Sequence, residues 1–79
     1  MIVKIPLTYG GCVTCQITDI VAVDEPNSYP TFYIKSSPIK FTVYKWVYDT
    51  YISLITNPLK MIELEQSKVV IDLGNIRVY

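Results

Sequence analysis

The hydrophobic pattern of residues 36–58 predicts one long amphipathic helix. Polar side chains recur three or four positions apart, as on one face of a helix with 3.6 residues per turn; they are Thr42, Lys45, Asp49, Ser53 and Thr56. Apolar side chains four positions apart form the opposite face, and they are Ile39, Val43, Val47, Tyr51 and Ile55. We therefore expect a helix over about residues 38–56, with its apolar face buried.

The ends of this segment also fit a helix. Ser37 can cap the first turn, and Pro38 suits the first helical position because its missing N–H would be unpaired there. Pro58 biases the residue before it away from helical geometry. Many of the intervening residues are β-branched or aromatic, and such residues prefer strands. The competing interpretation is a hairpin that turns near Asp49 and Thr50.

Alternating apolar and polar residues predict strands on both sides of this helix. The expected strands are residues 1–7, 12–18 continuing past Asp19 into 20–23, 31–35, 59–65, 68–73 and 76–79. Turns are expected at Gly10–Gly11 and Gly74–Asn75, and residues 24–30 are expected to form a loop. Pro6 suggests that the first strand lies at an edge or an end of a sheet.

The resulting order is β-β-β-α-β-β-β, which defines an α+β fold. Short connections favour antiparallel neighbours, so we expect a mainly antiparallel sheet. The helix at about residues 38–56 should pack on one face of that sheet, because its apolar side chains need cover. A chain of 79 residues is the size of one domain, so residues 1–79 are expected to form a single compact unit.

Composition indicates an apolar protein with balanced charge. Hydrophobic residues make up 51% of the chain, and 7 basic residues balance 7 acidic ones. A general nucleic-acid-binding protein needs a basic surface, so nucleic acid is not the expected partner. No stretch has the ~20 apolar residues of a membrane span, and no signal peptide is recognisable. We expect a cytoplasmic protein, or one packaged in a virion.

Cys12 and Cys15 form a C-x-x-C motif, which can be redox-active or supply half of a zinc site. Residues three apart on a strand face opposite sides, and the chain has no histidine and no third cysteine to complete four ligands. We therefore expect structural thiols and no metal or other cofactor. A disulfide, a zinc site shared between two chains and a thiol catalyst are the alternatives.

No arrangement of residues predicts an enzyme. Glu63 and Glu65 share one face of a predicted strand, but their spacing is that of solvated side chains. The chain lacks histidine, the usual proton carrier near neutral pH. None of its 3 glycines opens a predicted helix as a phosphate-binding loop would. A non-enzymatic role is therefore expected.

The aromatic residues carry the functional prediction. Tyrosine and tryptophan are favoured at protein interfaces, and the expected interface residues are Tyr29, Tyr33, Tyr44, Trp46 and Tyr48. The alternatives are that these side chains only fill the core, as tyrosines within a helix often do, or that they stack on nucleic-acid bases. We expect a small protein-binding or structural protein that self-associates, most simply as a two-fold dimer, or docks on a larger protein as an accessory protein, inhibitor or virion component. The predicted edge strands, residues 1–7 and 76–79, carry few charges and offer a second route to association.

Two alternative functions fit parts of the sequence. A nucleic-acid-binding module would use the outer face of the sheet, where Tyr33 and Lys35 share a predicted strand face. A thiol protein or an intersubunit zinc protein would use Cys12 and Cys15.

Overall fold

The computed structural model describes residues 1–67 and 70–76, and of Ser67 only the backbone. Its strands are β1 (Ile2–Pro6), β2 (Cys12–Gln16), β3 (Ile20–Val23), β4 (Thr31–Ile34), β5 (Lys40–Thr42) and β6 (Val70–Asp72). Its helices are the 3-10 turn η1 (Ile17–Asp19) and the α-helices α1 (Lys45–Ile55) and α2 (Pro58–Ser67). The α+β class is confirmed. The predicted order is wrong, because five strands precede two consecutive α-helices in the described residues.

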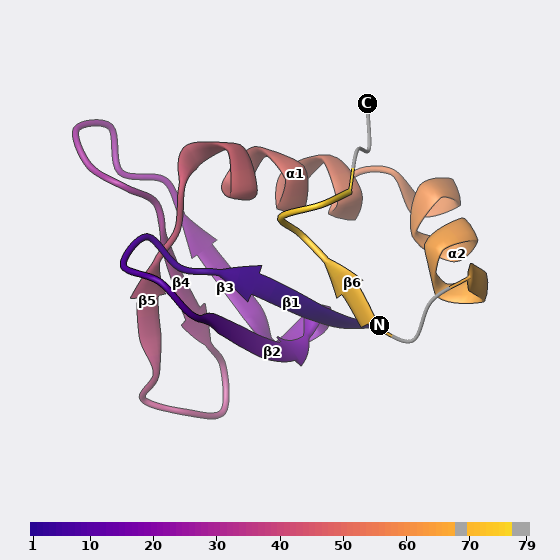
Figure 1. Cartoon of the computed structure of the whole chain (residues 1–79), viewed down its shortest axis with the longest axis horizontal. Helices are drawn as coiled ribbons and strands as arrows, with labels where there is room; N and C mark the ends of the chain where they lie inside the picture. Colours follow the sequence, from indigo (N-terminus) through magenta and orange to yellow (C-terminus); the bar gives the residue numbers. More distant parts are fainter. Residues whose placement is uncertain (68–69, 77–79) are drawn as a thin grey trace.

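The strands form two sheets rather than one (Figure 1). In the first sheet, β1 lies between β2, to which it is antiparallel, and β6, to which it is parallel. In the second sheet, β4 lies between β3 and β5 and is antiparallel to both. The mainly antiparallel pairing is confirmed. The parallel pair of β1 and β6 was not predicted; it uses the long connection that parallel strands need, through the second sheet and both helices.

β1 is the central strand of its sheet, so the edge position predicted from Pro6 was wrong. The predicted alternative, a terminal position, is met, because Pro6 is the last residue of β1. The N–H of Leu73 donates to the carbonyl of Lys4 at 2.9 Å, which shows that the even-numbered residues of β1 face β6. β6 ends at Asp72, which pairs with Lys4. The missing N–H of Pro6 therefore lies beyond the last residue pair, where no ladder bond is lost.

The helix begins at Lys45 rather than near residue 38. Residues 40–42 instead form β5, in which Phe41 pairs with Phe32 of β4. The hairpin between these strands turns at residues 35–39, where the N–H of Ile34 donates to the carbonyl of Ile39 at 3.2 Å. The backbone ladder and the burial of Phe41 outweigh the helical spacing of this segment. A hairpin does exist, but it does not turn near Asp49.

Residues 58–67 form α2, so the predicted strand over residues 59–65 was wrong. Pro58 occupies the first helical position, and the side-chain carbonyl of Asn57 accepts the N–H of Lys60 at 3.2 Å, which caps the helix. Met61 and Leu64, three residues apart, pack against the core. Ile62, which was predicted to face inward, is exposed.

The C-terminal predictions are met in part. The predicted strand over residues 68–73 is observed as β6 over residues 70–72, and residues 68–69 lie outside the described part. A turn follows it, and the N–H of Asn75 donates to the carbonyl of Asp72 at 3.0 Å. The predicted strand over residues 76–79 lies outside the described residues, apart from Ile76.

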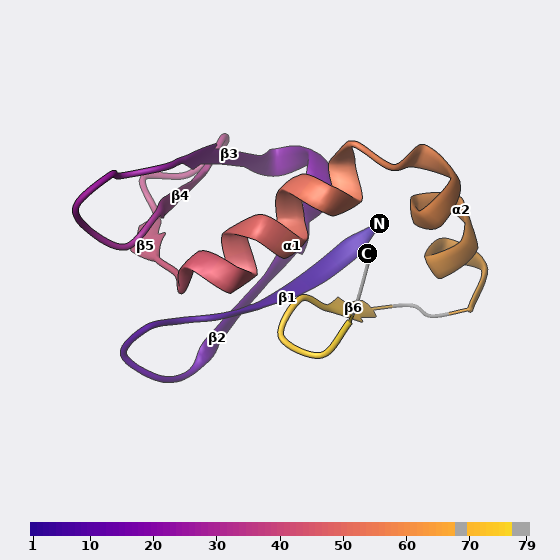
Figure 2. The ribbon, with the colours of Figure 1, turned by 90° about the horizontal axis from the view of Figure 1, so that it is seen from above.

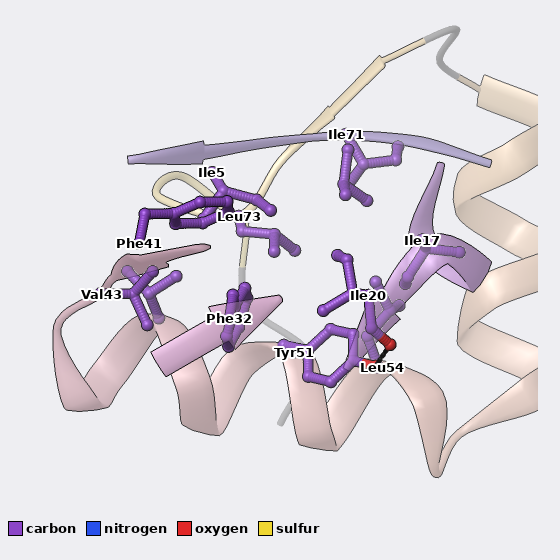
Figure 3. Packing of buried hydrophobic residues seen from close by; sticks show 12 residues of the cluster. Ile5, Ile17, Ile20, Phe32, Phe41, Val43, Tyr51, Leu54, Ile71 and Leu73 are labelled. Atoms are coloured by element: carbon purple, nitrogen blue, oxygen red, sulfur yellow. Dashed lines mark hydrogen bonds between the residues drawn. The ribbon is translucent and has the colours of Figure 1, made fainter. Parts of the chain in front are cut away.

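The core lies where the two sheets meet α1. Seen from above, α1 runs between β3 and β1, and α2 lies beyond its end (Figure 2). Figure 3 shows buried side chains meeting between β1 and α1, with Phe32 of β4 among them. The buried apolar residues are Val3, Ile5, Ile17, Ile20, Phe32, Phe41, Val43, Val47, Tyr51, Leu54, Ile71 and Leu73.

The buried face of the predicted helix is mostly confirmed. Val43, Val47 and Tyr51 are buried, although Val43 precedes the helix. Ile55 is 42% exposed, and Leu54 is buried in its place. At 3.6 residues per turn, Leu54 lies about 20° around the helix axis from Val47 and Ile55 about 80°. The buried face of α1 therefore includes Leu54 and not Ile55.

Candidate protein-binding surface

Three of the predicted interface residues lie side by side at the start of α1. The rings of Tyr44 and Trp46 stack, with 6.2 Å between centroids and 9° between planes. Tyr29 meets Tyr44 edge-on, with 5.6 Å between centroids and 85° between planes. We call Tyr29, Tyr44 and Trp46 the ring row. Tyr29 comes from the loop between β3 and β4, which lies beside the start of α1 (Figure 1).

The turn between β1 and β2 fixes the central residue of the ring row, Tyr44. The hydroxyl of Tyr44 donates to the backbone carbonyl of Thr8 at 3.1 Å. Thr8 is itself fixed to β5, because its N–H donates to the carbonyl of Thr42 at 3.3 Å and the two threonine hydroxyls lie 2.6 Å apart. The central ring is therefore positioned before any partner arrives, which lowers the entropy lost on binding.

The outer two rings of the row are open to solvent. Trp46 is 49% exposed and Tyr29 is 50% exposed, whereas Tyr44 is partly buried between them. The exposure of Trp46 agrees with its position three and four residues from Asp49 and Thr42 of the predicted polar face. A half-exposed tryptophan that rests on a fixed tyrosine has the chemistry of an interface hot spot, where large rigid rings supply most of the binding energy.

Trp46 also forms one wall of a hollow of about 390 Å³. The other walls are Lys4, Pro6, Gly11, Cys12, Asp72, Gly74 and Asn75. Gly74 keeps the hollow open, since a Cβ at this position would lie 3.1 Å from Cγ of Pro6 and 3.7 Å from Cη2 of Trp46. The hollow beside Trp46 can accept a partner's side chain.

A compensated charge cluster borders the ring row. Nζ of Lys45 lies 2.7 Å from a carboxylate oxygen of Asp24 and 3.9 Å from one of Asp49. The hydrogen bond to Asp24 raises the pKa of Lys45 above its ordinary value. The same ammonium lies 4.7 Å from the ring centroid of Tyr48, so this predicted interface residue belongs to the charged border. Interfaces have this arrangement of an aromatic centre and a polar rim.

Tyr33 is separate from the ring row. It is exposed on β4, beside a second hollow of about 370 Å³. This second hollow is lined by Tyr9, Thr31, Tyr33, Lys40, Phe41 and Thr42. Lys35, the cation expected beside Tyr33, is not among its walls. Tyr9 and Lys40 were missed in the sequence because they come from the β1–β2 turn and from β5, and only the folded chain brings them together.

The two cysteines face opposite sides of β2, as predicted. Cys12 is exposed and Cys15 is half-buried, and both are free thiols. Burial, and then the nearby carboxylate of Asp19, raises the pKa of Cys15, which lowers its thiolate fraction near neutral pH. Within residues 1–67 and 70–76, no group of three or more His, Cys, Asp or Glu side chains is placed to hold a metal ion.

A second apolar surface was missed because α2 had been predicted as a strand. Leu59 is 79% exposed, and Ile62 and Ile55 are also exposed. These residues are four and three positions apart, so a helical interpretation of residues 55–62 would have placed them on one face. In the structure Leu59 and Ile62 share one face of α2, whereas Ile55 belongs to α1, which ends before α2 begins at Pro58.

Comparison of the chain with known protein families, with curated proteins and with solved structures found no match. No helix within the described residues is both long enough and apolar enough to cross a membrane.

Proposed function

We propose that this is a non-enzymatic protein-binding protein that docks its ring row on a partner protein. The observation that carries the proposal is the stacked pair of Tyr44 and Trp46, half-open to solvent and tied to the carbonyl of Thr8. Aromatic side chains with few accessible rotamers bury a large area at a small entropy cost. Tyr44 packs against the core, but Tyr29 and Trp46 belong neither to the core nor to the side chains packed against it, so these two exposed rings are more than the core requires.

The surroundings of the ring row favour a protein over a charged ligand. Lys45 is already paired with Asp24, and the net charge of the chain is zero. A partner therefore needs no strong opposite charge, and association will depend only weakly on salt. The hollow beside Trp46 would take an apolar or flat side chain of that partner. The place of action, the cytoplasm or a virion, is part of the same proposal.

The experiment compares capture by three forms of the full chain. Wild type, Trp46→Ala and Tyr33→Ala are immobilised, exposed to a lysate of the source cells, and the retained protein is purified and its affinity measured. Trp46→Ala should weaken binding by at least about tenfold, as hot-spot truncation does. Tyr33→Ala is the matched control, because it removes an exposed tyrosine outside the ring row. Equal affinities for wild type and Trp46→Ala would contradict the proposal.

A second candidate function is single-stranded nucleic acid binding at the second hollow. The observation that favours it is the joint presence of Tyr9, Tyr33 and Lys40 around one space of about 370 Å³. Bases stack on exposed tyrosines, and a lysine can contact a phosphate. The balanced charge of the chain argues against tight binding, since counterion release supplies most of the affinity. Submicromolar binding of labelled oligonucleotides at physiological salt, lost in Tyr33→Ala, would make this the leading function.

A further inference from the structure

β2 leaves one side of its backbone unpaired. It lies on the side of β1 away from β6 (Figure 1). The N–H of Leu7 donates to the carbonyl of Gly11 at 3.2 Å, and that of Ile17 donates to the carbonyl of Met1 at 2.9 Å. These two bonds set the alternation of the antiparallel ladder, so the odd-numbered residues of β2 face β1. The N–H and carbonyl groups of Cys12, Thr14 and Gln16 consequently point outward.

Five of these six groups have no backbone partner within residues 1–67 and 70–76. The sixth, the carbonyl of Gln16, accepts the first hydrogen bond of the 3-10 turn η1. The other outer strands are each engaged in part by the chain itself. The carbonyl of Thr42 in β5 accepts the N–H of Thr8 at 3.3 Å, and that of Ile20 in β3 accepts the hydroxyl of Tyr51 at 3.4 Å. The carbonyl of Asp72 in β6 accepts the N–H of Asn75 at 3.0 Å. β2 therefore has the most open edge in the described fold.

The sequence of β2 contains nothing that blocks pairing with another strand. Proteins protect edge strands with lysine and other charged residues, with proline, or with bulges. β2 reads Cys-Val-Thr-Cys-Gln, without a charge or a proline, and all five residues pair with β1 without a bulge. The first sheet can accept another strand at this edge.

We propose that β2 pairs with β2 of a second copy of this chain, antiparallel about a two-fold axis at Thr14. In this register Thr14 lies opposite the partner's Thr14, and Cys12 lies opposite the partner's Gln16. The central Thr14 pair exchanges two bonds. Each of the two Cys12–Gln16 pairs adds one, from the N–H of Gln16 to the carbonyl of Cys12, because η1 engages the carbonyl of Gln16. The contact therefore forms about four new backbone hydrogen bonds. The first sheet of one copy, which has three strands, then joins the first sheet of the other copy to form one continuous sheet of six strands.

A second copy fits this edge because the register is self-complementary. Centred on Thr14, it is the one register that overlaps all five residues while keeping the outward groups opposite each other. It also places Val13 opposite the partner's Cys15. Both residues are half-buried on the inner face and pack beside the core, so the second copy would bury apolar surface that the single chain leaves open. The outer face matches polar residues with polar residues.

The size of the contact predicts a reversible dimer. Stable interfaces bury about 1,200–2,000 Å² in total, and a ladder of five residues per chain falls below that range. Zero net charge removes long-range repulsion between the copies. We therefore expect association in the micromolar to millimolar range. This inference does not depend on the proposed function, because it uses the backbone of β2 and is tested on the purified protein alone.

The experiment measures the mass of the full chain by light scattering over a concentration series, with a reductant present. Thr14→Lys places two like charges opposite each other across the axis, and Thr14→Pro removes an outward N–H while leaving the bonds to β1 intact. Thr14 is exposed, so both variants should fold. The matched control is Thr18→Lys, which adds the same charge at an exposed position in η1.

Wild type and Thr18→Lys should rise from one chain mass towards two with increasing concentration, whereas Thr14→Lys and Thr14→Pro should remain at one. A wild type that stays at one mass, or a Thr14→Lys variant that associates like wild type, would overturn the dimer.

A disulfide tests the register. Val13→Cys in a Cys12→Ser chain should form a disulfide with the partner's Cys15 under oxidised glutathione and so give a covalent dimer. In the proposed register these two residues form a non-hydrogen-bonded pair, whose Cα atoms lie about 4.5 Å apart, within disulfide range. Adding Thr14→Lys should abolish this covalent dimer. Doubling of the mass without a disulfide would overturn the register centred on Thr14.

Discussion

The stacking of Trp46 on Tyr44 depends on where α1 begins. The two residues are two positions apart, and side chains with that spacing in a regular helix point in widely different directions. Tyr44 lies just before the helix, with an extended backbone at φ −67° and ψ 150°, and Trp46 lies in the first turn. This change of backbone geometry lets the planes of the two rings lie 9° apart. The ring row therefore exists because the helix starts at Lys45 and not at residue 38.

The orientation of α1 predicts opposite outcomes for two aspartate substitutions. Val47→Asp puts an unpaired charge into the core, where Val47 is fully buried, and should cost several kcal/mol of a total stability of about 5–15 kcal/mol. Ile55→Asp adds the same charge on the same helix at a position that is 42% exposed, and should cost less than about 1 kcal/mol. Urea unfolding followed by circular dichroism measures both, and similar losses would contradict this orientation.

Tyr51 predicts a loss of stability at alkaline pH. Burial raises the pKa of Tyr51, and its hydroxyl donates to the carbonyl of Ile20 at 3.4 Å. A pKa that is higher in the folded than in the unfolded state favours folding below the unfolded value of about 10, and this contribution is lost as the pH rises through the folded pKa.

The measurement compares the free energies of unfolding of wild type and Tyr51→Phe from neutral pH upward. Phenylalanine keeps the ring but cannot ionise, so the contributions of other titrating groups cancel in the difference. The advantage of wild type, about 1 kcal/mol or less from one hydrogen bond, should be constant below about pH 10 and then fall. A difference that is independent of pH would show that Tyr51 is not buried as described.

The two cysteines predict two rates of thiol labelling. Cys12 is exposed and should react quickly, whereas Cys15 is half-buried with a raised pKa and should react slowly. The slow rate should increase with pH, because the raised pKa of Cys15 keeps its thiolate fraction low near neutral pH. Labelling with a chromogenic disulfide at low protein concentration measures both, and Cys15→Ser should retain only the fast phase. A single rate for both thiols would contradict the assignment of the two faces of β2.

The local pattern of the sequence was enough to predict β1 and β4. It wrongly joined β2 and β3 into one strand, whereas the structure separates them by η1 and places them in different sheets. In β1, Val3 and Ile5 alternate with Lys4, and the structure buries the two apolar residues. In β4, Phe32 is buried and its neighbour Tyr33 is exposed. Alternation reports which face of a strand is buried, but not which strands are neighbours. The parallel pairing of β1 with β6 depends on contacts across most of the chain, so no local pattern could indicate it.

The two errors around α1 have different physical causes. Phe41 was placed in the helix because its spacing fitted one, but its ladder with Phe32 is a tertiary interaction that the spacing does not contain. The start of α2 could have been recognised, since Asn57 before Pro58 is a helix-capping pattern. The alternation of Ile62 and Leu64 concealed it, although Met61 and Leu64 also fit a helix.

The candidate site was predicted as a set of residues but not as a surface. The position of Trp46 near the polar face of the helix indicated its exposure. The contact of Tyr29 with Tyr44 depends on the path of the loop over residues 24–30. The hollow beside Trp46 depends on the close approach of Gly74 to Pro6 and Trp46. These features arise from tertiary packing, so they were not available from composition or periodicity.

The most direct test of the proposed function uses the fluorescence of Trp46, which is the only tryptophan of the chain. The protein captured in the binding experiment is added to wild type, and the emission and quenching of Trp46 by acrylamide are followed; a captured protein that itself contains tryptophan is replaced by a phenylalanine-substituted form. If the ring row is the docking site, the emission should shift to shorter wavelength, and quenching should fall from the level of a half-exposed indole to that of a buried one, saturating at a fixed stoichiometry. Saturable binding that leaves the emission and quenching of Trp46 unchanged would contradict the account.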